Sequence, residues 1–455
     1  MVKKLILINP VGQRSGLLLS RFSVFQPLSL AYLAAVTPPN WEVKIIDENF
    51  DTFSFEQADL VGITSFTTNI NRAYEIAGQY RERGTKVVLG GIHASMVPDE
   101  AMQFADAILI GEAENVWAEI ISDYENNRLA RKYIGPPVDF ENSRIIPRRD
   151  LLHPGYFWES IQTSRGCPFN CSFCSVSRYM GKKYRQRKVE AVLEDIESIK
   201  GKHVFFLDDN LVGYSAENKQ RAKDIFRGMY ERNLQKKFWM QTSINMADDE
   251  ELVELAAQAG CMFVFVGFES ISTEQLRQMH KGVNLKNGVD NYRRVVDTFH
   301  KYGIAVLGSF VIGNDNESQD YYEELGDFLI RAGVDIVQIT LLTALPGTDL
   351  METMVKEKRL IFDNYPHDWA KYRFSHMVHQ PQGVDEETVY IGSNYIKNRI
   401  YSFPYYQYRM MRSFCALKNF KSFLMAYRAN QAYKKGWLNS HYHKRYPVKF
   451  LPPVK

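Results

Sequence analysis

Short apolar runs alternate with amphipathic segments through the first 130 residues of the chain. The apolar runs predict five strands, at Lys4–Ile8, Val43–Ile46, Leu60–Thr64, Val87–Leu89 and Ile108–Ile110. The segments between them predict helices over Pro27–Val36, Asn71–Gly84, Pro98–Phe104 and Glu114–Tyr124. Alternating strands and helices are typical of an α/β fold with a doubly wound parallel sheet. We therefore expect such a domain over residues 1–135, with ligands at the carboxyl ends of its strands.

A second alternating series follows a proline-rich linker at residues 136–158. Its predicted strands are Ser160–Thr163, His203–Leu207, Phe238–Thr242, Phe263–Phe268, Ala305–Ile312 and Ile336–Leu342. Its predicted helices include Val189–Ile199, Ala216–Arg232, Glu250–Ala259 and Val289–Tyr302. Six βα units over residues 159–349 predict a partial or full βα barrel with its site at the strand carboxyl ends. Residues 350–455 lose the alternation and predict a basic, aromatic-rich helical C-terminal domain.

Composition places the chain among soluble multi-domain enzymes. Its 455 residues are 45% hydrophobic and 24% charged, which excludes disordered, collagen-like and rod-shaped proteins. No apolar run is long enough to span a membrane, and the N-terminus resembles a first strand more than a signal peptide. Five cysteines exclude a disulfide scaffold and suit a reducing cytoplasm.

Three of the five cysteines, Cys167, Cys171 and Cys174, fall within eight residues directly after a predicted strand. Three thiols on one short loop predict a site for a soft metal. Iron–sulfur clusters are commonly held by four thiolates, so three would leave one iron of a [4Fe–4S] cluster open to a further ligand. A structural zinc site completed by a remote ligand is the alternative. Cys261 and Cys415 are isolated, and we expect both to be small buried hydrophobes.

The stretch Thr163-Ser-Arg-Gly-Cys-Pro-Phe-Asn-Cys-Ser-Phe-Cys174 resembles the signature of the radical S-adenosylmethionine (SAM) enzymes. That signature is CxxxCxxC with an aromatic residue, here Phe173, before the last cysteine. The form is similar to that of the subgroup with an N-terminal cobalamin-binding domain, and the resemblance extends over about residues 1–350. It implies a radical SAM core at residues 159–349, in which the open iron chelates SAM. One electron from the cluster then cleaves SAM to methionine and a 5′-deoxyadenosyl radical.

Polar residues at later strand ends resemble the secondary motifs of this family. The resemblance implies that Asp208, Asp209 and Asn210 contact the methionine amino group, which an acidic pair suits. Capping of the next helix by Asp209 and Asn210 is the alternative. Further SAM contacts are implied for Gln241, Ser243, Glu269 and Gly313, with Glu317 beside the last of these.

The N-terminal sheet resembles the cobalamin-binding Rossmann-like fold. Cobalamin contacts are implied for the strand-end residues Asn9, Ser65, Phe66, Thr67, Gly90, Gly91, His93, Gly111 and Glu112. Paired glycines let a ligand approach the backbone, although Gly90-Gly91 could equally form only a tight turn. The Asp-x-His-x-x-Gly loop that supplies an axial histidine in many cobalamin proteins is absent from residues 9–16. We therefore expect cobalt with water or no protein ligand below it, and rank His93 low as a ligand.

The resemblance implies a cobalamin-dependent radical SAM enzyme that methylates an unactivated carbon of a lipid or another secondary metabolite. In this chemistry cobalamin takes a methyl group from one SAM, and a second SAM becomes the radical that activates the substrate. An electron donor such as flavodoxin or ferredoxin is implied as a partner. One alternative is an enzyme of the same architecture that forms a ring or a carbon–carbon bond, or rearranges its substrate, without methyl transfer. Another is a non-catalytic metal-binding membrane adaptor.

The C-terminal residues 388–455 contain 13 Lys and Arg, 16 aromatic residues and no Asp or Glu. Basic amphipathic helices with aromatic residues can lie at a membrane interface. Within this tail Leu417, Phe420, Leu424 and Tyr427 recur at helical spacing. We expect a cytoplasmic protein whose residues 388–455 contact the inner face of the membrane; the alternative is that this stripe packs on the barrel. Nucleic acid is not an expected partner, because no RNA-binding module is recognisable.

Overall fold

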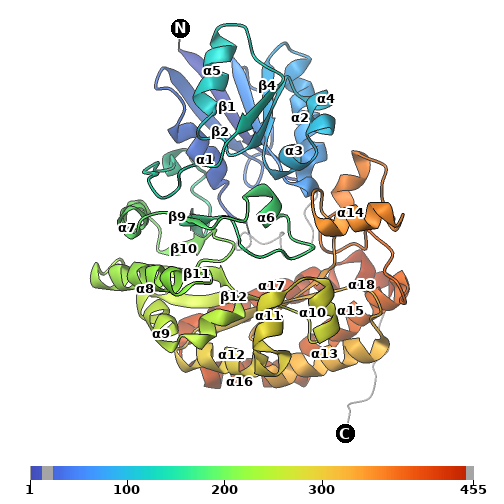
Figure 1. Cartoon of the computed structure of the whole chain (residues 1–455). Coiled ribbons are helices and arrows are strands. Elements are labelled where there is room, and N and C mark those ends of the chain that lie inside the picture. The colour runs from blue at the N-terminus through green and yellow to red at the C-terminus, as the bar shows by residue number, and fades with distance from the viewer. Residues whose placement is uncertain (1, 13–23, 447–455) are drawn as a thin grey trace.

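The computed structural model describes residues 2–12 and 24–446, and it is built around two parallel sheets (Figure 1). The N-terminal sheet has the strand order β2-β1-β3-β4-β5-β6. Its strands are β1 (Lys3–Asn9), β2 (Trp41–Asp47), β3 (Leu60–Thr64), β4 (Lys86–Gly90), β5 (Ala107–Gly111) and β6 (Lys132–Gly135). Its helices are α1 (Leu28–Ala35), α2 (Ile70–Arg81), α3 (Ile92–Met96), α4 (Pro98–Phe104) and α5 (Trp117–Glu125).

Helices cover both faces of this sheet, because alternate side chains of a strand point to opposite faces. In β1, Leu5 and Leu7 enter a core with α1 and α5, whereas Ile6 and Ile8 enter a second core with α2. The five predicted strands and the doubly wound sheet are confirmed. Strand β6 was not predicted, since it has only four residues.

The second sheet has the order β7-β10-β11-β12-β13-β14, so sequential strands are neighbours. These strands are β7 (Glu159–Ile161), β10 (His203–Phe206), β11 (Lys237–Thr242), β12 (Cys261–Glu269), β13 (Ala305–Ile312) and β14 (Ile336–Leu341). The larger helices between them are α7 (Val189–Ser198), α8 (Ala216–Glu231), α9 (Glu250–Ala259), α12 (Tyr292–Lys301) and α13 (Gln319–Ala332). Among the described residues β7 and β14 do not pair, so the predicted barrel is partial.

A layer of aromatic side chains fills the inner face of the partial barrel at its base. Phe205, Trp239 and Phe263 belong to it, with ring centroids 3.9 Å apart for the first two and 5.0 Å for the last two. The open side is covered by α17 (Phe420–Leu438), whose Phe423 and Ala426 pack on this layer. Helix α17 therefore covers the inner face that further strands would cover in a closed barrel.

The C-terminal region divides between the two cores. Its helices are α14 (Asp349–Lys356), a 3₁₀ turn at His367–Lys371, α15 (Glu386–Tyr401), α16 (Tyr405–Leu417), α17 and α18 (His441–Arg445). Met354, Trp369 and Tyr372 complete the α2 side of the N-terminal core. Helices α15, α16 and α17 pack on the barrel instead.

The predicted apolar stripe of the tail does not form one buried face. Leu417 is buried, but Phe420 is 65% and Tyr427 39% exposed. The face of α17 that packs inward carries Ser422, Ala426, Asn430, Gly436 and Trp437. Cys261 is buried as predicted, but the prediction for Cys415 is wrong, because it lies on the exposed side of α16. The last nine residues of the tail, 447–455, lie outside the described residues.

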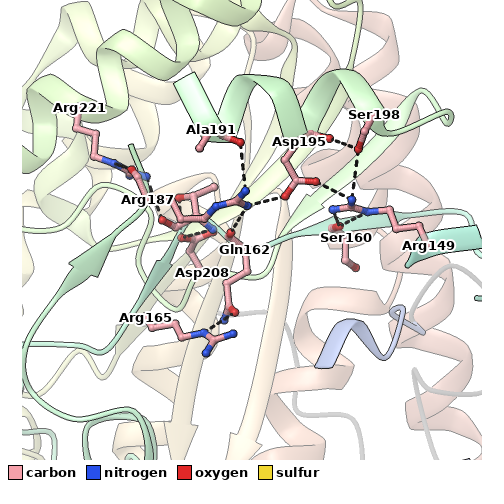
Figure 2. Close-up of polar contacts among 11 residues, drawn as sticks. Arg149, Ser160, Gln162, Arg165, Arg187, Ala191, Asp195, Ser198, Asp208 and Arg221 are labelled. Carbon is pink, nitrogen blue, oxygen red and sulfur yellow. Dashed lines mark hydrogen bonds and ion pairs between the residues drawn. The ribbon is translucent and has the colours of Figure 1, made fainter. Parts of the chain in front are cut away.

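A buried ion network fixes the end of β7 (Figure 2). Asp195 on α7 is fully buried and accepts hydrogen bonds from Arg149 (2.6 Å) and Arg187 (2.5 Å). Arg149 also donates to the backbone carbonyl of Ser160 at 2.9 Å, and Arg187 to that of Gln162 at 3.3 Å. The Asp195 carboxylate thus holds Arg149 and Arg187 in place, and both arginines donate to backbone carbonyls of the segment that precedes the three cysteines.

We predict that Asp195→Ala lowers the free energy of unfolding by about 3–5 kcal/mol, because two guanidinium groups lose their buried partner. Urea denaturation followed by circular dichroism measures this loss. The control is Asp150→Ala, which breaks an exposed pair with Arg148 and should cost about 0–1 kcal/mol. Equal losses in the two variants would contradict this role of Asp195.

Candidate active site

The carboxyl ends of the two sheets face each other, with α6 (Val176–Tyr179) between them (Figure 1). The Tyr179 hydroxyl donates to the carbonyl of Gly111 at the end of β5, at 3.4 Å. On the other side, Gly347 beyond β14 lies against Met96 of α3. Ligands bind at the carboxyl ends of parallel strands, so this arrangement brings two ligand-binding edges together.

The cysteines lie on a loop of residues 166–184, here called the cysteine loop. Its base is closed by the two-residue antiparallel strands β8 (Ser164–Arg165) and β9 (Arg185–Gln186). Further along the loop, Ser172 donates its backbone N–H to the carbonyl of Met279 (3.1 Å) and accepts from Leu350 (2.9 Å). The loop is therefore anchored at its base and at its middle to the barrel.

A cavity of about 200 Å³ lies between the cysteine loop and the strand ends. The predicted residues that line it are Cys167, Cys171, Phe173, Cys174, Asp209, Asn210, Gln241, Ser243 and Glu269. The structure thus brings most of the residues predicted for cluster and SAM binding to one place. We call this space the cluster cavity.

The three thiols fit a cluster better than a single ion. Burial raises the pKa of all three, that of Cys174 to about 12, so ligation has to displace protons. In residues 2–12 and 24–446 no three Cys, His, Asp or Glu side chains converge as ligands of one metal ion. A zinc ion needs such convergence, whereas in a cluster each thiolate binds a different iron. The donor set therefore fits an iron–sulfur cluster with three protein ligands.

Asp208 and Asp209 have different surroundings. Asp208 is fully buried and accepts from the Thr163 N–H (3.1 Å), the Thr163 hydroxyl (2.8 Å) and the Ser164 hydroxyl. Asp208 does not line the cluster cavity, and its carboxylate instead holds the segment before the cysteine loop (Figure 2). Asp209 instead faces the cavity, where desolvation and the Asp208 charge raise its pKa to about 7. Neither caps α8, whose N-cap is Ser215.

Glu269 at the end of β12 pairs with a lysine that the sequence did not predict. Lys281 Nζ lies 2.6 Å from Glu269 Oε1, and both side chains are mostly buried. Burial alone would lower the pKa of Lys281, but the charges of Glu269 and Cys171 raise it. Lys281 therefore places a permanent positive charge beside the thiols. It follows the short helix α10 (Thr273–Gln278), where no strand-end pattern pointed to it.

Gly313 does not line the cluster cavity. Its N–H donates to Glu317 at 2.7 Å, and Glu317 is itself buried and accepts from the Tyr322 hydroxyl. A side chain at Gly313 would meet Met377. Gly313 and Glu317 thus form a closed polar contact at the end of β13 that is not part of the cavity wall.

The N-terminal strand ends combine an exposed aromatic side chain with tight backbone packing. Phe66, after β3, is 62% exposed. Gly91 has φ +95° and Gly111 φ +85°, and a Cβ at Gly91 would lie 2.6 Å from the carbonyl oxygen of Ser65. These glycines therefore let neighbouring strand ends approach each other closely. An exposed aromatic ring at an edge opposite the cluster cavity suits the apolar macrocycle of cobalamin.

The remaining predicted cobalamin contacts are engaged within the protein. His93 is fully buried, with its ring nitrogens 3.2 Å from the Thr67 hydroxyl and 3.4 Å from Glu100. His93 is thus not free to bind cobalt, and residues 1–135 contain no other histidine. Asn9 donates to Asp47 at 2.8 Å. Residues 13–16 of the loop without the axial-histidine motif lie outside the described residues.

A cluster loop at the mouth of a partial βα barrel, opposite a doubly wound sheet, is the architecture of a radical SAM enzyme with a B12-binding domain. Family models for the radical SAM superfamily and the B12 binding domain match residues 161–329 and 14–121. Bacteriochlorophyllide d C-8(2)-methyltransferase from Chlorobaculum tepidum is 30% identical over 419 residues, which cover 88% of this chain and 86% of that protein. The chain belongs to this family of B12-binding-domain radical SAM enzymes.

Two further relatives agree with this assignment. Hopanoid C-2 methylase from Rhodopseudomonas palustris is 28% identical over 355 residues, which cover 74% of this chain and 66% of that protein. The structure of the radical SAM methyltransferase TsrM from Kitasatospora setae, with cobalamin and a [4Fe–4S] cluster bound, superposes with a TM-score of 0.67 at 18% identity. That match covers 94% of this chain and all of TsrM. The predicted cofactors, a [4Fe–4S] cluster, SAM and cobalamin, are confirmed at the level of the family.

We predict that Cys171→Ala abolishes the iron–sulfur absorbance of the reconstituted protein, because the cluster loses one of three thiolates. Iron content and the visible spectrum after anaerobic reconstitution measure this. The matched control is Cys415→Ala, which removes an exposed thiol far from the cavity and should leave both unchanged. A wild-type spectrum in Cys171→Ala would exclude the cysteine loop as the cluster site.

Proposed function

We propose that this enzyme transfers a methyl group to an unactivated carbon of an apolar small molecule, a lipid or another secondary metabolite. The observation that carries the proposal is that α6, whose Val176 and Ser177 line the cluster cavity, contacts the carboxyl edge of the B12-binding sheet through Tyr179 and Gly111. A substrate bound between the two edges has the cluster cavity on one side and the B12-binding sheet on the other. The named relatives support methyl transfer, and a hopanoid is itself a lipid.

The bound cofactors supply the electron that cleaves SAM and the methyl group that is transferred. The electron comes from a donor such as flavodoxin or ferredoxin. Asp209 holds the SAM ammonium group by charge-assisted hydrogen bonds. Glu269, fixed by Lys281, holds the ribose hydroxyls, while Gln241 and Ser243 hold the remaining polar groups. Phe173 and Phe265 in the cavity wall would exclude water from a bound SAM.

We predict that the reconstituted enzyme, supplied with SAM, cobalamin, a low-potential reductant and a lipid extract, forms 5′-deoxyadenosine and S-adenosylhomocysteine together. With SAM carrying a trideuteromethyl group, mass spectrometry should find one lipid that gains this label. Methyl transfer consumes one SAM as methyl donor and a second as radical source, so both products are required. Comparison of lipids from cells with and without the gene identifies the same species.

The other reactions give different products. Deoxyadenosine without S-adenosylhomocysteine would indicate ring or bond formation and would refute methyl transfer. If neither product forms while metal is bound, the chain is a non-catalytic adaptor. Cys171→Ala serves as the control, because it should form neither product. A label found only in a water-soluble metabolite would exclude the lipid and leave methyl transfer in place.

We also propose that the outer surface of α16 and α17 contacts an anionic membrane from the cytoplasmic side. Met411 is 63%, Phe414 53% and Phe420 65% exposed on this surface. Lys418 and Lys421 flank Phe420 in the chain, and no Asp or Glu occurs after Glu387. In the described part of the chain no helix is both long and apolar enough to cross a bilayer, so the contact is peripheral.

We predict that the protein co-sediments with vesicles containing phosphatidylglycerol, and that Phe414→Ser with Phe420→Ser releases it. Each lysine near an anionic surface contributes about 1 kcal/mol, so added salt should also weaken binding. The control is Ile134→Ser, which removes a 66% exposed apolar side chain from β6. Equal binding of the double variant and the wild type would assign these rings to another role.

A further inference from the structure

Two arginines at the base of the cysteine loop reach across to the N-terminal sheet. Arg165 of β8 and Arg185 of β9 are paired residues of the same short ladder. Arg165 Nη1 lies 2.9 Å from Glu112 Oε2, and Arg185 Nη1 lies 3.0 Å from the same oxygen. Arg185 Nη2 also donates to Glu112 Oε1. One carboxylate of the B12-binding domain therefore binds both strands that close the cysteine loop.

These charges are almost completely removed from water. The side chains of Glu112, Arg165 and Arg185 are 6%, 7% and 11% exposed. Arg165 has a second acidic partner, Glu114, at 2.5 Å, and its guanidinium lies 4.7 Å from the centre of the Phe140 ring. Burial would raise the pKa of Glu112, but the two arginines lower it. Buried ion pairs with this many hydrogen bonds resist separation, because each group left alone would be a buried charge.

The backbone on both sides of this contact is fixed. Glu112 directly follows Gly111, which packs so closely on Gly135 that a Cβ would lie 2.5 Å from its carbonyl oxygen. Glu112 also accepts the N–H of Val138 at 2.9 Å. On the other side, Arg165 precedes Cys167 by two residues. Gly166, between Arg165 and Cys167, packs so closely that a Cβ would lie 2.3 Å from the carbonyl oxygen of Lys183. The path from the edge of the B12-binding sheet to the first cluster ligand is therefore packed at each step.

We propose that Glu112, Arg165 and Arg185 form a clasp that sets the position of the cluster relative to cobalamin. Glu112 is then a positioning residue and not the cobalamin contact predicted from the sequence. The inference rests on the proposed function, since the two cofactors act on one substrate. Reacting groups must meet within a narrow range of distance, and a displacement of about 1 Å can cost about 10²-fold in rate. The clasp provides that constraint outside the cluster cavity itself.

The test is a spectroscopic measurement of the two cofactors in the complete protein. Cob(II)alamin and the reduced cluster are both paramagnetic, so the cluster accelerates the spin relaxation of cobalt to an extent set by their separation. We expect wild type to show one enhanced rate in pulsed electron paramagnetic resonance. Glu112→Gln, which keeps the size but removes the charge, should show a smaller and more widely distributed enhancement. The same enhancement in wild type and Glu112→Gln would overturn the clasp.

Controls separate this proposal from instability and from failure of the proposed function. Asp327→Asn removes the partner of Arg399 between α13 and α15, away from the sheet edges, and should leave the relaxation unchanged. If Glu112→Gln does not fold, Arg185→Lys keeps the charge but loses the paired geometry, and wild-type relaxation there would overturn the clasp. Cluster and cobalamin contents are measured first. A wild-type protein that binds neither cofactor contradicts the proposed function, whereas full loading with unchanged relaxation in both variants contradicts only the clasp.

Discussion

The order of the cysteine loop depends on buried contacts between arginine and acidic side chains. Between residues 166 and 184 the regular structure is one short helix, α6, so side-chain contacts on the flanking segments add to the backbone hydrogen bonds that anchor the loop. Asp195 holds Arg149 and Arg187 on the strand before the loop (Figure 2). Asp208 accepts hydrogen bonds from the hydroxyls of Thr163 and Ser164, which lie between that strand and the loop. Each of these carboxylates is fully buried, so each is costly unless its partners stay in place. Separating these carboxylates from their partners would cost free energy, and this cost keeps the loop in one arrangement.

The geometry of parallel sheets explains why the carboxyl edges of the two sheets face each other. All strands of a parallel sheet deliver their carboxyl ends to one edge, and alternate residues point to one face. Along β11 of the barrel, Trp239 lies in the aromatic base layer, and the next two odd-numbered residues, Gln241 and Ser243, lie in the cavity wall. In the N-terminal sheet the corresponding edge ends at Phe66 and Gly111. The facing edges therefore bring two ligand-binding sites together, although residues 136–158 separate the two sheets in the chain.

Much of this could be predicted from the sequence, because the strands are apolar runs and the cysteines are adjacent in the chain. The parts that could not be predicted depend on contacts between distant segments. Asp208 and Asp209 are identical neighbours, and the hydrogen bonds from Thr163 and Ser164 distinguish the positioning residue from the cavity residue. Lys281 comes from a connection between helices, where charged residues are usually solvated. Glu112 was predicted to contact cobalamin because it follows a glycine at a strand end. Its partner in the structure, Arg185, lies 73 residues further along the chain.

The C-terminal helices determine which side of the partial barrel is covered. Because the barrel is partial, its inner face would be exposed along one side, and α17 covers that side at the aromatic base layer. Tyr433 of α17 reaches Gln338 on β14 at 2.5 Å, which fixes the helix to the last strand. The segment with Trp369 fastens the other end of the region to the N-terminal core, where its indole donates to Glu100 at 2.9 Å. The region thus packs on both domains, while Met411, Phe414 and Phe420 stay exposed on the outward side of α16 and α17.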